Sequence, residues 1–288
     1  MMTGRQEKTQ NIIDQAHDIL AAFHPMTLRQ VYYQLVSRQV IKNSVSSYHA
    51  VSKALIDARL EGIIPWRWIE DRLRRPRSVP MWDDLVDFAE AALNSYRRDV
   101  WATQTHYLEV WLEKDALSGI FEDVLEEYGV TLNVGRGYDG WSSLYNAAER
   151  FQECSERPVR YAVTVLYFGD FDPSGEDMVR SLRDRLAILR SEPEIIKAAL
   201  TVDDIVQYSL PSDFTKTTDT RSQAHIAKHG DVAVELDALP VDILRTRLTD
   251  AIEQRMDLTA LQVVKDLEAS ERLKLIEALQ YIQGEEEV

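Results

Sequence analysis

The sequence has one cysteine, no internal repeat and no long apolar run. Cys154 is the only cysteine among 288 residues, so no internal disulfide can form, which is typical of a reducing compartment. The longest apolar stretches are far shorter than a bilayer-spanning helix requires. The first ten residues lack the apolar core of a signal peptide. We therefore expect a cytoplasmic protein that does not enter a membrane.

Positive charge is scarce overall but is concentrated near the N-terminus. The formal net charge of −15 argues against nucleic-acid binding by the chain as a whole. Residues 1–78, however, carry 12 Lys and Arg against 7 Asp and Glu, whereas the other 210 residues carry 21 against 41. A basic N-terminal unit on an acidic body favours a DNA-binding module joined to a second domain. Chance segregation of surface charge is the alternative.

The first 80 residues have the pattern of three short helices and an extended element. Apolar residues recur at helical spacing over 10–23, and Thr27 is placed to cap a second helix. A third helix is expected from about Ser46 to Glu61, followed by an apolar, Trp-rich segment over 63–69. This order is typical of a winged-helix variant of helix-turn-helix.

The rest of the chain alternates strand and helix patterns, which predicts a parallel sheet covered by helices. We expect an α+β protein with a winged-helix domain at 1–80, a linker helix at 81–104, and an α/β domain with C-terminal helices at 105–288. Residues 212–230 are polar and indicate a loop. The expected strands are 107–112, 131–134, 161–168 and 204–210, and the expected helices are 116–128, 141–153, 175–190, 240–254 and 258–283.

Three carboxylates follow two of the predicted strands directly. Glu113 follows the strand at 107–112, while Asp170 and Asp172 follow the strand at 161–168. Functional groups gather at the carboxyl ends of parallel strands, so the three side chains could meet. Mg²⁺ prefers carboxylate oxygens and supports phosphate chemistry. The alternative is structural: Glu113 pairs with Lys114 or an arginine, and the aspartates cap a helix.

Other polar residues near this segment are less informative. Ser174 is placed to cap a helix that begins near Glu176. Glu176 and Asp177 could add negative charge, although acids are favoured at any helix N-terminus. The sequence does not place Glu235. The six histidines show no metal-ligand spacing that we recognise, which favours structural or surface roles.

The order of elements around these acids resembles the Toprim domain of topoisomerases, bacterial primases and several nucleases. A strand ending in Glu, a crossover helix, a Gly-containing turn and a later strand ending in Asp-x-Asp-x-x-Gly span about residues 105–190. The resemblance implies phosphodiester chemistry with Mg²⁺, or Mn²⁺ in its place. It gives Glu113, Asp170 and Asp172 the metal-binding positions, with Glu113 also a candidate general acid or base.

Two adjacent tyrosines lie on the second predicted helix. Consecutive helical residues point about 100° apart, so Tyr32 and Tyr33 cannot share one face. Tyr32 lies nearer the apolar face of that helix, and Tyr33 is expected at its edge. A phenol there can attack a phosphodiester if cationic groups stabilise the phenolate. Packing at a domain boundary is the alternative.

The segment Thr27–Tyr33 resembles the tyrosine-bearing helix of the topoisomerase VI A subunit and the meiotic double-strand-break endonuclease. In that family a winged-helix domain precedes a Toprim domain. The resemblance implies that Tyr33 is the nucleophile and that Arg29 holds the scissile phosphate. It also implies a homodimer on double-stranded DNA, in which the tyrosine of one subunit meets the metal site of the other. The turn at 135–138 resembles the family's Gly-rich loop.

The chain departs from that family in size. It is closer to the reduced "mini-A" homologues, and only about ten residues precede the first helix, where the family carries an extension that engages a GHKL-type ATPase B subunit. No nucleotide-binding loop is present, so ATP-driven strand passage requires such a partner. Two alternatives stay open: a hydrolytic Toprim nuclease, as in the Wadjet anti-plasmid system, and a non-catalytic DNA-binding module. The expected DNA contacts are Lys53, Arg59, Arg74, Arg75 and Arg136.

Overall fold

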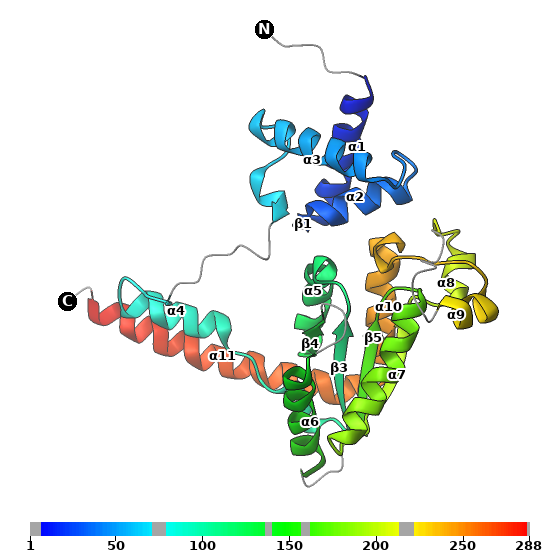
Figure 1. The fold of residues 1–288 in the computed structure, drawn as a ribbon. Helices are drawn as coiled ribbons and strands as arrows, with labels where there is room; N and C mark the ends of the chain where they lie inside the picture. Colours follow the sequence, from blue (N-terminus) through cyan, green and yellow to red (C-terminus); the bar gives the residue numbers. More distant parts are fainter. Residues whose placement is uncertain (1–6, 71–78, 136–139, 157–161, 213–221, 287–288) are drawn as a thin grey trace.

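The computed structural model describes residues 7–70, 79–135, 140–156, 162–212 and 222–286. They form an α+β protein with one four-stranded parallel sheet and many helices (Figure 1). The N-terminal helices form a separate layer beside the end of the sheet where β3 and β5 terminate (Figure 1). In the described part of the chain, no helix combines the length and the apolar character needed to cross a membrane.

Three helices make up the N-terminal unit: α1 (Glu7–Phe23), α2 (Leu28–Ser37) and α3 (Val45–Leu60). Thr27 caps α2 in a capping box with Gln30, which confirms the predicted cap. The apolar face of each helix is buried, so helical spacing in the sequence predicted the helices correctly. After η1 (Trp66–Trp68), the extended element in the described residues up to 70 is β2 (Ile69–Glu70), which pairs in parallel with β1 (Met26–Thr27).

The sheet has the strand order β4-β3-β5-β6, with every neighbouring pair parallel. Its strands are β3 (His106–Leu112), β4 (Thr131–Val134), β5 (Ala162–Phe168) and β6 (Glu194–Ala199). In the register of the two central strands, Leu112 lies opposite Phe168. These two strands therefore end at the same edge, and the residues that follow them emerge side by side.

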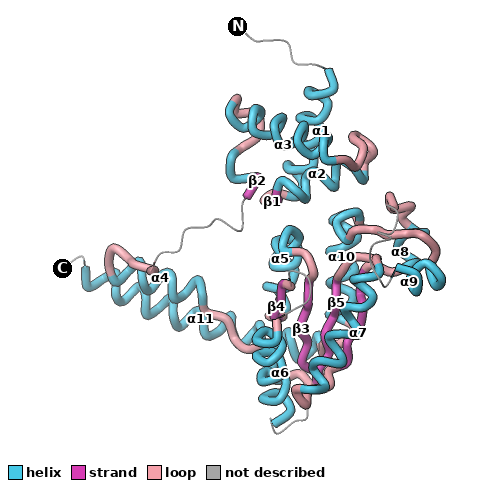
Figure 2. Tube along the Cα trace, in the orientation of Figure 1, coloured by secondary structure: helices cyan, strands magenta, loops and turns pink. Residues whose placement is uncertain are grey.

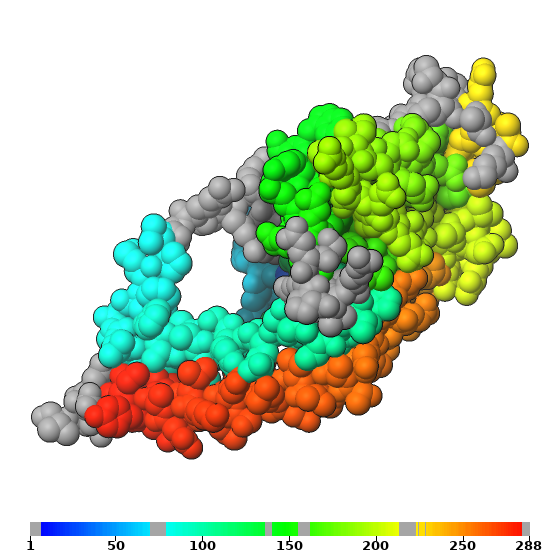
Figure 3. All heavy atoms as spheres, turned by 90° about the horizontal axis from the view of Figure 1, so that it is seen from below, coloured from blue at the N-terminus to red at the C-terminus, as the bar shows by residue number. Residues whose placement is uncertain are grey.

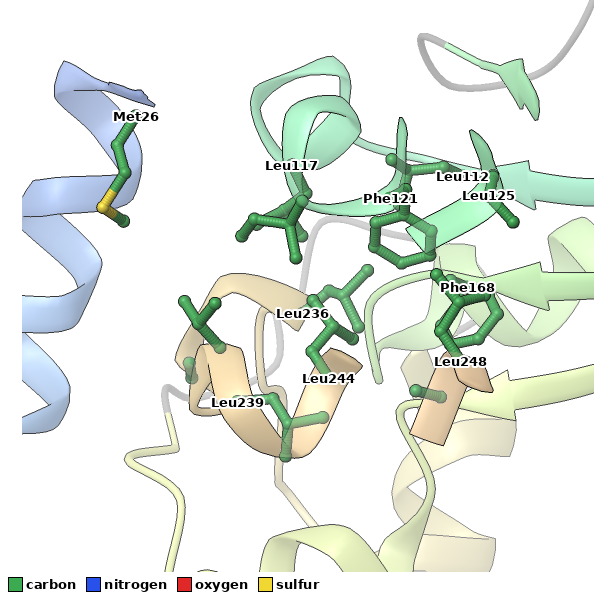
Figure 4. Packing of buried hydrophobic residues seen from close by; sticks show 14 of the residues in the cluster. Met26, Leu112, Leu117, Phe121, Leu125, Phe168, Leu236, Leu239, Leu244 and Leu248 are labelled. Carbon is green, nitrogen blue, oxygen red and sulfur yellow. The ribbon is translucent and has the colours of Figure 1, made fainter. Parts of the chain in front are cut away.

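Each face of the sheet is covered by its own helices. One core contains residues of α6 (Trp141–Glu156) and α7 (Pro173–Ile188). The other contains residues of α5 (Ser118–Tyr128), which follows η4 (Asp115–Leu117), and of α10 (Val241–Glu253). Phe121 of α5 packs edge-on against Phe168 of β5, with ring centroids 4.9 Å apart (Figure 4).

The second core extends to η5 (Leu236–Ala238), which lies just before α10. Leu236 is fully buried beside Leu244, and Leu117 packs in the same cluster (Figure 4). Phe171 and Val234 form an antiparallel bridge that ties the chain leading into η5 to the end of β5. The apolar residues of this segment thereby fix the polar residues between them at the edge of the sheet.

Two expectations about residues 191–230 are wrong. The segment at 204–210 is not a strand, because Val202–Gln207 form helix α8 with a capping box between Thr201 and Asp204. The fourth strand is instead β6, which the sequence did not indicate. The predicted loop at 212–230 contains helix α9 (Ser222–His229), whereas 213–221 lie outside the described residues.

A helical arm extends from the sheet domain. Helix α4 (Leu85–Ser95) runs beside α11 (Leu258–Glu286), and η3 (Val100–Thr103) leads from the arm to β3 (Figures 2 and 3). Arg98, which lies between α4 and η3, forms an ion pair of 2.6 Å with Glu271 of α11. This arm holds no residue of the predicted site.

Candidate functional site

Glu113 and Asp170 meet at the carboxyl edge of the sheet. The backbone N–H of Glu113 continues the ladder to Phe168 O at 2.9 Å, so β3 and β5 deliver the two acids together. Glu113 Oε2 accepts a hydrogen bond from the Asp170 backbone N–H at 3.0 Å and another from the Tyr167 hydroxyl at 3.1 Å. The convergence that the strand pattern predicted for these two residues is present.

Gly169 leaves room for this contact. A Cβ at this position would lie 2.5 Å from Glu113 Oε2 and 2.6 Å from a ring carbon of Tyr167. Because Tyr167 is buried in the core, its ring cannot move aside. A side chain at position 169 therefore forces the Glu113 carboxylate out of its place.

We expect Gly169→Ala to lower the free energy of unfolding by about 1–3 kcal/mol, the usual cost of overpacking a filled site. Denaturant titration followed by circular dichroism measures the change. The matched control is Gly140→Ala, because a Cβ there meets no atom within 4 Å. Equal stability of the two variants would contradict the tight packing at Gly169.

Asp172 has the capping role that is the structural alternative to metal binding. It is the N-cap of α7, and its Oδ1 accepts the Gly175 backbone N–H at 2.6 Å. The expectation that Ser174 caps this helix is therefore wrong, because Pro173 already occupies the first turn. Among the described residues, Glu113, Asp170 and Asp172 do not form a group whose ligand atoms all lie within 4.8 Å of one another.

Lys114 lies in the middle of a second set of acids. Its ammonium group lies 3.1 Å from Asp170 Oδ1, 3.0 Å from Glu235 Oε2 and 3.2 Å from Asp237 Oδ1. Burial alone would lower the pKa of Lys114, but the surrounding carboxylates outweigh burial and raise it above its ordinary value. The structural alternative, in which Glu113 pairs with Lys114, is not among these contacts, since the lysine pairs with Asp170, Glu235 and Asp237.

Asp237 is the acid that sequence reasoning missed. Its side chain is 1% exposed, and burial raises its pKa. Leu236, next to it, donates its backbone N–H to Asp170 Oδ1 at 2.7 Å, which draws η5 against the end of β5. The spacing Glu235-x-Asp237 repeats that of Asp170-x-Asp172. That repeat was the only signal in the sequence that could have indicated a second acidic pair.

At this edge of the sheet, carboxylates outnumber the lysine and arginine side chains that lie near them. Burial, followed by the charge of Asp170, raises the pKa of Glu113, and burial likewise raises the pKa of Asp170. Lys197 donates from Nζ to Asp170 O at 3.0 Å, while burial lowers the pKa of this lysine. The carboxylates supply the oxygen donors that a hard divalent cation prefers, but Asp170 already pairs with Lys114 and Asp172 caps α7.

Tyr33 lies on the edge of α2 that faces η5. Tyr32 is buried, and its hydroxyl donates to Asn43 Oδ1 at 2.9 Å, whereas Tyr33 is only half-buried, as the helical pattern predicted. Burial and a hydrogen bond to Glu235 raise the pKa of Tyr33, while Arg29 opposes this shift. The phenol is therefore held in its protonated form.

Arg29 connects the tyrosine to the acids. Its Nη2 donates to the Tyr33 hydroxyl at 3.5 Å, and its guanidinium lies 3.6 Å from Glu235 and 3.8 Å from Asp237. Lys114 Nζ lies 5.6 Å from the centre of the Tyr33 ring. One network thus joins the tyrosine, the two cations and the acids of η5 and β5.

The surface beside Tyr33 contains a groove. This groove, of about 480 Å³, is lined by Arg29, Tyr33, Asn43 and Ser44, among others. A second cavity, of about 20 Å³, is lined by Tyr33, Glu235 and Ala238, among others, and has room for roughly one water molecule. Tyr33 therefore lines both a groove that is open to the outside and a small cavity that it shares with Glu235.

The expected DNA contacts are only partly described. Lys53 is exposed on α3. Arg59 places its guanidinium 4.6 Å from the centre of the Trp66 ring. Arg74, Arg75 and Arg136 lie outside the described residues. A third set of candidate ligands, which the sequence did not indicate, consists of Glu176, His225 and His229.

Comparison with protein families and with curated proteins finds no match for this chain. The assignment of a function therefore depends on the geometry of the site and on the resemblance of the motifs.

Proposed function

We propose that this chain is a DNA-cleaving enzyme of the topoisomerase VI A type, with Tyr33 as its nucleophile and a Mg²⁺ site at Glu113, Asp170 and Asp172. The observation that carries the proposal is the meeting of Glu113 and Asp170, whose backbone N–H donates to Glu113 Oε2 at 3.0 Å, next to a network that includes Tyr33. A winged-helix reading of α1–α3 and a Toprim reading of the sheet domain belong to the same proposal.

The residues divide the reaction between them. Glu113, Asp170 and Asp172 would hold Mg²⁺ (Mn²⁺ could replace it), which neutralises developing charge on the phosphate oxygens. Arg29 would bind the scissile phosphate, because its planar guanidinium suits phosphate oxygens. Attack by the Tyr33 oxygen forms a 5′-phosphotyrosyl bond and releases the 3′-oxygen, which is protonated to a hydroxyl. Glu235, which lines the same small cavity as Tyr33, would take the phenolic proton.

The attack is proposed to occur between two copies of the chain. Within one chain, the Lys114 ammonium group lies 5.6 Å from the centre of the Tyr33 ring and pairs with Asp170 at 3.1 Å. Tyr33 also lines the groove of about 480 Å³. A homodimer on double-stranded DNA would let each tyrosine reach its partner's acids and cut one strand. Strand passage would require a separate GHKL-type ATPase.

Incubating the chain with duplex DNA and Mg²⁺, followed by a denaturing gel, tests the proposal. We expect protein covalently attached to 5′ ends, and a loss of about 10³-fold or more in Tyr33→Phe, as for removal of a catalytic nucleophile. The matched control is Tyr145→Phe, because Tyr145 is exposed on α6. Free ends produced by Tyr33→Phe would replace the proposal with a hydrolytic nuclease. DNA binding without cleavage in Mg²⁺ or Mn²⁺ would favour a non-catalytic module.

A further inference from the structure

A group of two histidines and one glutamate lies close to the segment that contains Asp170 and Asp172. Glu176 belongs to the first turn of α7, while His225 and His229 lie four residues apart on one face of α9. His225 Nδ1 is 3.3 Å from Glu176 Oε2, and His229 Nε2 is 2.9 Å from Glu176 Oε1. All three ligand atoms lie within 4.8 Å of one another. Ligands at about 2.1 Å from a tetrahedral zinc ion are roughly 3.4 Å apart, which matches these distances.

The hydrogen bond of His225 fixes which ring nitrogen carries a proton. Its Nε2 lies 2.9 Å from the Val232 carbonyl oxygen, which can only accept, so Nε2 carries the hydrogen. In the neutral ring, Nδ1 then presents a lone pair to the carboxylate of Glu176. Two acceptors facing each other at 3.3 Å repel, and either a second proton on the ring or a metal ion between the two atoms removes the repulsion. Metal-binding histidines characteristically donate their second N–H to a carbonyl in this way.

His229 shows the same need for a cation. Its Nε2 is buried and has no aligned hydrogen-bond partner, although Glu176 Oε1 lies only 2.9 Å away. The His225 side chain is 2% exposed and that of His229 is 12% exposed, so water does not satisfy these nitrogens freely. Phe171, which stands between Asp170 and Asp172, packs its ring 5.2 Å from one imidazole and 5.1 Å from the other. The apolar ring holds both imidazoles in place.

We propose that Glu176, His225 and His229 bind one Zn²⁺ ion that fastens α9 to α7. Two imidazole nitrogens and one carboxylate suit zinc, whereas Mg²⁺ favours oxygen ligands. Three protein ligands leave a fourth position for water. The ion holds α9, an eight-residue helix, against the start of α7, where Asp172 is the cap. This site is separate from the Mg²⁺ site proposed for cleavage and does not depend on it.

Isothermal titration of chelator-treated, untagged protein with ZnCl₂ tests the site. We expect one ion per chain with a Kd of about 1 μM or tighter, unaffected by millimolar Mg²⁺. Zinc at 100 times the Kd should raise Tm by roughly 5 °C or more. Co²⁺ in place of zinc should give the visible absorption of a tetrahedral site with nitrogen ligands.

Two variants and one control decide the outcome. His229→Gln and Glu176→Gln should each weaken zinc binding by about 100-fold or more, because each removes one of three ligands. His49→Gln is the matched control, since His49 is exposed on α3. Equal zinc affinity in His229→Gln and the parent chain would overturn the proposal, as would a parent chain that is folded by circular dichroism and binds no zinc. Asp170→Asn should retain zinc, so the outcome is independent of DNA cleavage.

Discussion

Replacing Lys114 by methionine is expected to lower the free energy of unfolding by about 3–5 kcal/mol near pH 7.5, the usual cost of removing one partner of a buried charge network. The methionine keeps most of the volume but leaves three carboxylates without their common cation. Those carboxylates now lie 3.0–3.2 Å from the ammonium group, and Asp237 is almost completely buried. Denaturant titration at constant ionic strength measures the loss.

The loss is expected to be smaller near pH 5. Because the pKa of Lys114 is raised on folding, its stabilisation is complete below its unfolded pKa and is lost only as pH rises through the folded value. The pKa values of Asp170 and Asp237 are also raised, so stability falls as pH rises from the ordinary carboxyl range through the raised values. Without the ammonium those values rise further. The variant should therefore lose stability more steeply than the parent chain between about pH 5 and pH 7.5.

A surface lysine supplies the comparison. Lys265 pairs with Glu127 at 3.4 Å across an exposed surface, so Lys265→Met should change stability by less than about 1 kcal/mol. If Lys114→Met is no less stable than Lys265→Met, or if its deficit does not grow with pH, the ion network does not hold η5 to the edge of the sheet.

Features governed by local chemistry could be predicted from the sequence. The Thr27 cap depends only on the three residues that follow it, and three strands appeared as apolar runs. The meeting of Glu113 and Asp170 follows from the rule that parallel strands end at one edge, so it could be predicted without coordinates. The sequence did not indicate β6, because Glu194 and Lys197 interrupt its apolar residues. Lys197 has a partner only in the fold, where it donates to the Asp170 carbonyl oxygen.

Contacts between segments that are distant in the sequence could not be predicted. Glu235 and Asp237 reach Lys114 because an apolar residue between them enters the core and a bridge ties the segment to β5. The pattern of residues along the sequence does not predict that this segment returns to the end of β5. The spacing of His225 and His229 is a metal-ligand spacing only once 222–229 is known to be helical, and this segment was expected to be a loop. The polar composition of this segment favoured a loop in the prediction, because its helical pattern is short.

The mixed dimer of Tyr33→Phe and Asp170→Asn chains should recover strand cleavage that neither variant has alone. If tyrosine and metal site meet between subunits, one of the two sites in the mixed dimer has an intact Tyr33 and intact acids, and it should cut one strand of the duplex. Co-expressed, differently tagged chains purified through both tags give the mixed dimer, and nicking of closed circular DNA is the readout. Each single-variant dimer should nick at least about 10³-fold more slowly than the parent chain.

The alternative arrangement gives the opposite result. If Tyr33 acts on the acids of its own chain, both sites of the mixed dimer carry one lesion, and cleavage stays absent. This arrangement would require Lys114 to move, because its ammonium group pairs with Asp170 at 3.1 Å and lies 5.6 Å from the centre of the Tyr33 ring. A mixed dimer of Asp184→Asn and Tyr33→Phe is the control, since Asp184 is exposed on α7 away from the acids, and it should retain one working site in either arrangement. Nicking by the control without nicking by the Asp170→Asn mixture would place the reaction within a single chain and require Lys114 to move.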